Sequence, residues 1–127
     1  MCLFINNKVR NNHHKEDGYC VAYKNVTQTN YSPYKGGYKY SVGENISNRP
    51  TTPLTCAEII HNEIEKGFHL CLKYKDAKTT GKKYFTPDKT IKVYYKPEDV
   101  VSYGMWENGK EKTVVVTKLI IKSLEGV

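Results

Sequence analysis

The sequence predicts a single α+β domain in which a mostly antiparallel, twisted β-sheet of about six or seven strands packs against one main α-helix. Three observations lead to this prediction. Short runs of strand-forming residues alternate with Gly, Pro and Asn turn signals along most of the chain. One segment, near residues 55–66, carries the start and stop signals of a helix. The length of 127 residues is that of one domain, so we expect residues 1–127 to fold as a single unit.

The N-terminal strands are predicted from composition. Residues 2–5 form a short apolar run, which predicts a short strand. Residues 6–17 are polar and basic, so we expect an exposed loop there. Residues 19–26 are rich in β-branched and aromatic residues and are bounded by turn residues, which predicts a second strand.

A turn and a further strand are expected next. Residues 32–37 contain a proline and two adjacent glycines, so the backbone can turn sharply there or approach a ligand closely. Residues 38–42 then alternate in a way that predicts a strand. In this strand Tyr38 and Tyr40 share one face and Lys39 lies on the other, so we expect the two tyrosines to pack inward.

The main helix is predicted from its two ends. Thr55 is a suitable N-cap, and Glu58, three residues later, completes a capping box. Lys66 falls in the last turn, where a cation suits the helix dipole, and Gly67 is a common C-terminal stop. These signals predict a helix over residues 55–66 that packs on the sheet.

The C-terminal half contains the remaining strand candidates. They are residues 68–72, 91–95, 100–106 and 112–124. Residues 74–78, between the first two, are predicted to form a short helical turn. Asn108-Gly109 between two strand-like runs is the strongest short signal for a hairpin. The last run is long, so we expect a bulge near Thr117 and Lys118.

Composition restricts the classes of function. The chain has 20 Lys and Arg against 13 Asp and Glu, and its formal charge of +7 favours anionic partners. Only two of the basic residues are Arg, so sequence-specific DNA binding is not expected. No apolar run approaches the roughly 20 residues of a membrane span, and the apolar start is too short for a signal peptide. We therefore expect a cytoplasmic protein without membrane contact, with four reduced cysteines, no metal site and no cofactor.

The segment between Asp17 and Glu44 carries the main functional signal. It has no acidic residue but contains six tyrosines and three lysines. Lysines hold anions, while a tyrosine offers a flat ring to a base and a hydroxyl to a phosphate. The predicted ligand is therefore an anionic, nucleotide-like small molecule. We predict that it contacts nine residues: Tyr23, Lys24, Tyr34, Lys35, Gly36, Gly37, Tyr38, Lys39 and His69.

The order of several motifs resembles a family of small proteins from phages and prophages. These motifs are CLFI at 2–5, SPY at 32–34, GYKY at 37–40 and GFH at 67–69. The similarity spans nearly the whole chain and implies a viral protein that acts in the cytoplasm of a host bacterium, with no catalytic residues to carry over. Small phage proteins of this kind often neutralise host components. The leading hypothesis is therefore a non-catalytic anti-defence protein that sequesters a nucleotide signal of bacterial immunity, as a homo-oligomer.

Two alternatives stay open. Tyrosine is enriched at interface hot spots, so the first is an inhibitor that binds a host protein through a Tyr-rich surface. The second is an ADP-ribosyltransferase-like enzyme or its degenerate relative, because residues 67–71 with Ala77 are similar to a strand and following alanine of that fold. The chain departs from this pattern at Tyr23-Lys24, where those enzymes place Arg or His, and at Cys71, which replaces a hydroxyl residue. These departures favour a protein that binds a ligand over an active enzyme.

Overall fold

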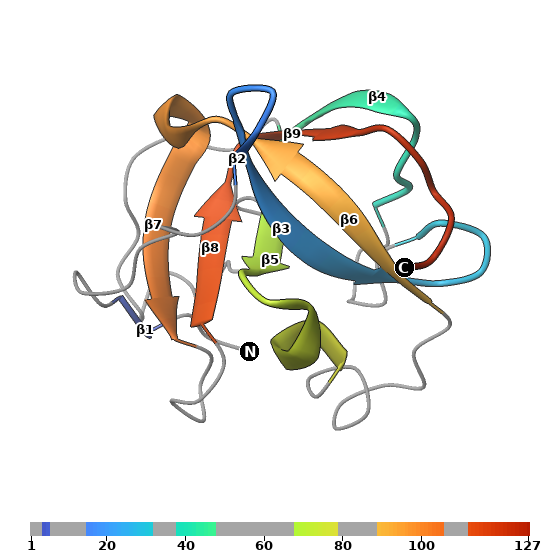
Figure 1. The fold of residues 1–127 in the computed structure, drawn as a ribbon, viewed down its shortest axis with the longest axis horizontal. Coiled ribbons are helices and arrows are strands. Elements are labelled where there is room, and N and C mark those ends of the chain that lie inside the picture. The colour runs from blue at the N-terminus through green and yellow to red at the C-terminus, as the bar shows by residue number, and fades with distance from the viewer. Residues whose placement is uncertain (1–3, 6–14, 32–37, 48–67, 79–88, 106–111) are drawn as a thin grey trace.

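The computed structural model describes residues 4–5, 15–31, 38–47, 68–78, 89–105 and 112–127. They form one nine-stranded sheet (Figure 1) in the order β1-β7-β8-β5-β3-β6-β9-β4, with β2 paired to β3 beside this path. The strands are β1 (Phe4–Ile5), β2 (Lys15–Glu16), β3 (Tyr19–Val26), β4 (Gly43–Ile46), β5 (Phe68–Cys71), β6 (Lys89–Tyr95), β7 (Val100–Met105), β8 (Lys112–Val116) and β9 (Lys118–Ile121). The described neighbours all pair antiparallel, which confirms the predicted sheet, although the strands outnumber the expected six or seven.

Several predicted elements agree with the structure. The run at 19–26 is β3, and the runs at 68–72, 91–95 and 100–106 correspond to β5, β6 and β7. The short helix predicted at 74–78 is present. β7 and β8 pair as the hairpin signal predicted. The predicted main helix at 55–66 lies outside the described residues.

Strand β2 corrects the expectation of a continuous exposed loop over residues 6–17. Asp17 and Gly18 both have positive φ, 52° and 82°. A tight hairpin of the type that favours Asp-Gly requires positive φ at both central residues. The turn therefore folds Lys15 and Glu16 back onto the start of β3. A two-residue strand has no periodicity of its own, which is why the pattern did not reveal it.

The strand expected at 38–42 is also corrected. Within the described residues, this segment makes a single isolated bridge, between Tyr31 and Lys39, and the regular strand begins only at Gly43. The buried side chain of Asn45 takes the place of a partner strand. Its Oδ1 accepts a hydrogen bond from the Ser41 amide at 3.2 Å, and its Nδ2 donates to the Ser41 carbonyl at 2.9 Å.

The long C-terminal run divides into β8 and β9 at Thr117, where a bulge was expected. The Thr117 amide donates to the Asp99 carbonyl at 2.9 Å, and the Thr117 carbonyl accepts from the Ser47 amide at 2.7 Å. The chain exchanges strand partners at this point. β8 pairs with β5 and β7, whereas β9 pairs with β6 and β4.

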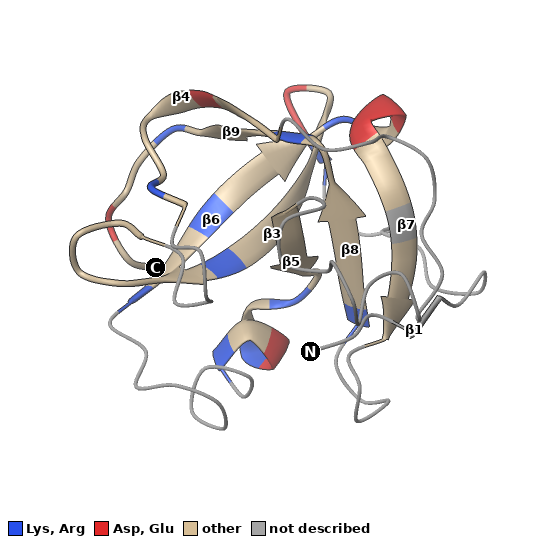
Figure 2. Cartoon of the chain, turned by 180° about the vertical axis from the view of Figure 1, so that it is seen from behind, with Lys and Arg blue, Asp and Glu red and all other residues tan. Residues whose placement is uncertain are grey.

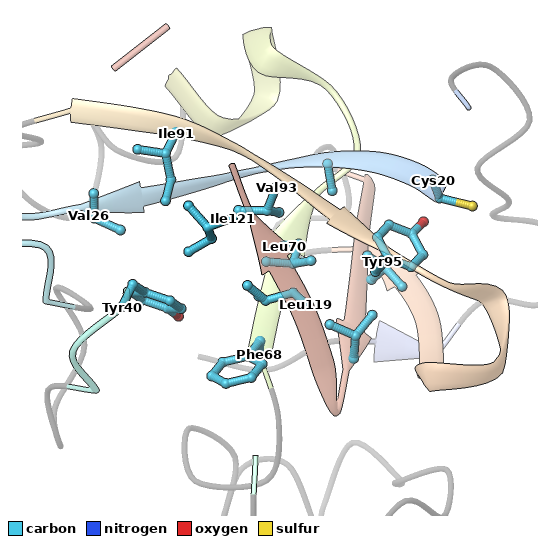
Figure 3. Packing of buried hydrophobic residues seen from close by; sticks show 13 residues of the cluster. Cys20, Val26, Tyr40, Phe68, Leu70, Ile91, Val93, Tyr95, Leu119 and Ile121 are labelled. Carbon is cyan, nitrogen blue, oxygen red and sulfur yellow. The ribbon is translucent and has the colours of Figure 1, made fainter. Parts of the chain in front are cut away.

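The core occupies one face of the curved sheet (Figure 3). Alternate residues of β3, β5, β6 and β9 point toward one another there, together with Tyr40. The labelled side chains are Cys20, Val26, Tyr40, Phe68, Leu70, Ile91, Val93, Tyr95, Leu119 and Ile121. All of them are buried, so the next residue along each strand lies on the opposite face. That opposite face carries most of the charged side chains of β6 and β9.

A buried polar contact fastens the short helix at 74–78 to the sheet. Asn25 of β3 donates from Nδ2 to the Ala77 carbonyl at 2.8 Å, and its Oδ1 accepts from the Thr90 hydroxyl at 2.7 Å. Asn25, Thr90 and Ala77 are all buried. Because buried polar groups are costly when they lack partners, this contact determines where the helix docks.

Replacement of Asn25 should therefore destabilise the fold. We expect Asn25→Ala to lower the free energy of unfolding by about 2 kcal/mol, because it leaves the Ala77 carbonyl and the Thr90 hydroxyl without this partner. Urea unfolding followed by circular dichroism measures the change. Thr29→Ala, at an exposed position, is the control and should stay within about 0.5 kcal/mol of wild type. Equal effects of the two variants would contradict the role given to Asn25.

Candidate functional site

Five of the nine predicted binding residues lie in the described part of the chain, namely Tyr23, Lys24, Tyr38, Lys39 and His69. The other four, Tyr34, Lys35, Gly36 and Gly37, lie outside it. A ligand contact at the Gly-Gly turn therefore stays a prediction. The five described residues all lie on or beside β5 and β3, but they divide between the two faces of the sheet.

Lys24 points into the core. It follows Ala22 and precedes Val26 in the row of β3 side chains on the core face, and it is 5% exposed. Its Nζ donates to the His69 carbonyl at 2.9 Å, which joins β3 to β5. Burial lowers the pKa of Lys24 to about 8, and the nearby Cys71 only partly offsets this effect. Lys24 therefore contributes to the interior of the protein, and its ammonium group is not displayed at the surface.

Tyr23 lies on the opposite face from Lys24. It pairs with Cys71 across the β3–β5 ladder, and its ring meets the Tyr74 ring edge-on at a centroid distance of 5.8 Å. Lys78 lies over the Tyr74 ring, with its Nζ 5.4 Å from the ring centroid. His69 shares this face with Cys71, because the two alternate with the core residues of β5.

Tyr38 and Lys39 belong to a separate group. The Tyr38 ring lies 4.9 Å from that of Tyr40 and 5.0 Å from that of Phe68. Tyr40 is 2% exposed, as expected, whereas Tyr38 is 39% exposed, which corrects the expectation that both pack inward. Lys39 extends over the exposed ring of Tyr31 at 5.7 Å.

A pocket that the sequence reasoning did not predict lies where β6, β9, β4 and the 3-10 helix η2 (Pro97–Asp99) meet. Its volume is about 180 Å³, and it is open to solvent. Its lining residues are Tyr19, Glu44, Tyr94, Tyr95, Lys96, Asp99, Lys118, Leu119 and Ile120. Figure 2 shows basic and acidic residues gathered at this end of the sheet. We call it the Lys96/Lys118 pocket.

Sheet register places the two lysines of this pocket next to each other. Tyr94 of β6 pairs with Ile120 of β9, and the strands are antiparallel. Lys96, two residues after Tyr94, and Lys118, two residues before Ile120, are therefore cross-strand neighbours on the face opposite the core. Tyr94 and Ile120 also line the pocket, beside this pair.

Both lysines are engaged within the protein. Lys96 places its Nζ 5.4 Å from the centroid of the Tyr19 ring. Lys118 forms an ion pair with Glu44 at 3.1 Å. The hydrogen bond and charge of Glu44, with a contribution from Asp99, raise the pKa of Lys118. The pocket thus combines two cations, aromatic walls and two carboxylates that interact with one of the cations.

One signal in the sequence pointed to this pocket. Lys92-x-Tyr94-x-Lys96 alternates along the strand predicted at 91–95 and the residue that follows it, so the lysines and the tyrosine are expected on one face. The sequence does not show that β6 lies next to β9, because strand pairing depends on the register of the whole sheet. Most of the predicted binding residues lie close together in the sequence, whereas the residues that line the pocket come from distant segments.

The described residues show neither a metal site nor a membrane-spanning helix. The described residues contain no group of three or more His, Cys, Asp or Glu side chains placed to hold a metal ion. Among them no helix has both the length and the apolar character needed to cross a membrane. Comparisons with protein-family models, curated proteins and solved structures find no significant match. The geometry of the chain itself is therefore the basis of the proposed function.

The burial of Lys24 predicts a specific pH dependence of stability. Its folded pKa of about 8 lies below the ordinary 10.5, so the unfolded chain binds more protons between these values and stability rises with pH across that range. We expect the free energy of unfolding to increase by about 2 kcal/mol from pH 8 to 10. Above pH 10 the buried Tyr40, whose pKa is raised by desolvation, opposes any further gain.

Replacement of the lysine isolates its contribution. Lys24→Met should be more stable than wild type at pH 7 and should lack the rise between pH 8 and 10, as measured by urea unfolding at each pH. Lys39→Met, at an exposed position, is the matched control and should keep the rise. A rise that persists in Lys24→Met would assign the pH dependence to another group.

Proposed function

We propose that this protein is a non-catalytic binding protein that sequesters an anionic, nucleotide-like molecule in the Lys96/Lys118 pocket. The observation that carries the proposal is the placement of two neighbouring lysines in a pocket with aromatic walls. A lysine ammonium recognises phosphate as a point charge, and tyrosine rings provide apolar faces for a base. The volume of about 180 Å³ is below the roughly 300–1,000 Å³ of sites that enclose a whole drug-sized ligand, so the pocket would hold only part of a nucleotide.

A ligand would have to compete with Glu44 for Lys118. The side chains of this ion pair are 36% and 49% exposed, respectively for Lys118 and Glu44. Exposed pairs of this kind contribute about 0–1 kcal/mol, so a phosphate with its larger charge can displace the carboxylate. The lining residues include no Cys, Ser, Thr or His, so hydroxyl side chains of Ser and Thr, thiols and imidazoles are absent from the described lining.

The resemblance to phage and prophage proteins supplies the biological part of the proposal. A viral protein that binds a nucleotide without converting it would remove that nucleotide from its host receptor. The ligand we propose is therefore a nucleotide signal of bacterial defence. A homo-oligomeric state belongs to the same proposal, because the terminal strands of a sheet can pair with a second copy.

A second candidate has its own supporting observation. Four exposed large side chains lie on β4, the last strand of the described order, or in the described parts of the chain before it, at residue 31 and residues 38–42. They are Tyr31, Tyr38, Val42 and Ile46, with exposed fractions of 41%, 39%, 62% and 58%. Clustered aromatic and aliphatic surface is typical of protein interfaces. An inhibitor of a host protein would use this surface and would not require the pocket lysines.

The proposed function predicts stabilisation by a nucleotide. We expect at least one cyclic dinucleotide or ADP-ribose-type nucleotide to raise Tm in a thermal-shift screen, because saturation at 100 times Kd adds about 2.7 kcal/mol. Lys96→Met with Lys118→Met should weaken that binding by about 10- to 100-fold, since two charged contacts are lost. Failure of every nucleotide, together with no ultraviolet-absorbing molecule in a heat extract, would reject the proposal.

A matched variant locates the site. Lys35→Ala with Lys39→Ala removes the same charge from the segment that the sequence favoured, and we expect it to change nucleotide affinity less than about threefold. Isothermal titration calorimetry compares the two double variants with wild type. A larger loss in the Lys35/Lys39 variant would place the ligand at the Gly-Gly turn instead of in the pocket.

A further inference from the structure

A second pair of lysines lies beyond the pocket on the same two strands. The pairing of Tyr94 with Ile120 places Lys92 near Lys122, on the other side of Tyr94 from Lys96 and Lys118. Like charges in cross-strand neighbours are unfavourable. Their proximity therefore requires compensation from groups outside the β6–β9 ladder.

Three hydrogen-bond donors converge at this point. Lys92 Nζ lies 5.6 Å, and Lys122 Nζ 4.4 Å, from the centroid of the Tyr94 ring. The third donor is the Tyr94 hydroxyl, carried by a side chain that is itself 7% exposed. Lys92 and the Tyr94 hydroxyl both donate to Glu16, and the pKa of Lys122 is raised mainly by Asp17 and in part by the charge of Glu16, so the three donors lie close to one carboxylate.

The chain fills this receptor with its own carboxylates. Glu16 uses both oxygens, accepting from Lys92 Nζ at 2.6 Å and from the Tyr94 hydroxyl at 2.9 Å. Asp17 accepts from Lys122 Nζ at 3.1 Å. Glu16 ends β2 and Asp17 begins the tight turn after it, whose positive φ angles bring both acids to β6 and the end of β9.

These internal contacts are weak enough to be exchanged. The side chains are 30% and 38% exposed in the Lys92–Glu16 pair and 50% and 81% exposed in the Lys122–Asp17 pair. β2 has only two residues and lies off the main strand order, paired to β3. A phosphate monoester brings up to two negative charges and three acceptor oxygens to a single point, which matches three donors better than two separate carboxylates do.

We propose that Lys92, Tyr94 and Lys122 form a phosphate-binding subsite that Glu16 and Asp17 fill until a phosphate monoester displaces them. This inference rests on the proposed function, which it deepens, because Tyr94 also lines the Lys96/Lys118 pocket. A nucleotide base in the pocket and its phosphate at the subsite would use both ends of one continuous surface. Release of the β2 turn accompanies binding.

Inorganic phosphate is the direct probe of the subsite. Titration of the full chain at constant ionic strength, followed by ¹H–¹⁵N NMR, should give saturable shifts at the amides of residues 15–18. Glu16→Gln with Asp17→Asn removes the internal competitors and should tighten phosphate binding about tenfold. Lys92→Met with Lys122→Met should abolish the shifts, while Lys96→Met with Lys118→Met, which has the same net charge, should retain them.

Three outcomes would overturn the subsite: no saturable shift at residues 15–18, shifts that survive in the Lys92/Lys122 variant, or no tightening in the Glu16/Asp17 variant. If the Lys92/Lys122 variant does not fold, the comparison of the Glu16/Asp17 variant with wild type is sufficient to test the subsite. Titration with AMP separates free phosphate from a nucleotide. AMP binding lost only with Lys96 and Lys118 supports the pocket and rejects the subsite, whereas a phosphate response without nucleotide binding supports the subsite and rejects the proposed function.

Discussion

The exchange of strand partners at Thr117 is the constraint on which the rest of the structure depends. Hydrogen bonds from Thr117 to Asp99 and from Ser47 to Thr117 turn the chain out of one ladder and into another. β8 remains beside β5 and β7, and β9 crosses to β6. If the chain continued straight from β8 beyond Thr117, the lysines that follow Thr117 would lie next to different strands. The pocket and its neighbouring lysine pair therefore both follow from one residue's backbone bonds.

Electrostatics on the β6–β9 surface follow a common pattern. The register sets lysines near one another at two levels, Lys92 with Lys122 and Lys96 with Lys118. Carboxylates from the β2 turn, β4 and η2 offset this repulsion from outside the ladder. Since these pairs are exposed, an external anion can replace the carboxylates at modest cost. In the proposed function, the same carboxylates would occupy the lysines until an anionic ligand replaces them.

Sequence reasoning succeeded where a signal is local and failed where it is not. β3 was readable because eight consecutive residues favour a strand. β4 was misplaced because the Asn45 side chain, and not a strand, satisfies the backbone of Ser41. Lys24 was read as a surface cation because nothing in its neighbours shows that its ammonium reaches the His69 carbonyl. The density of tyrosine and lysine before Glu44 likewise drew attention to one segment, although residues of that segment divide between two faces.

By itself, the sequence determined the antiparallel β class, the position of most strands, the short helix at 74–78 and the net positive charge. These properties come from local propensity and net charge, which do not depend on distant contacts. The tertiary structure alone decided which residues lie together. Tyr19 and Lys118, for example, line one pocket although they are far apart in the chain. Strand pairing brings such residues together, and pairing depends on the register of the whole sheet and not on any single segment.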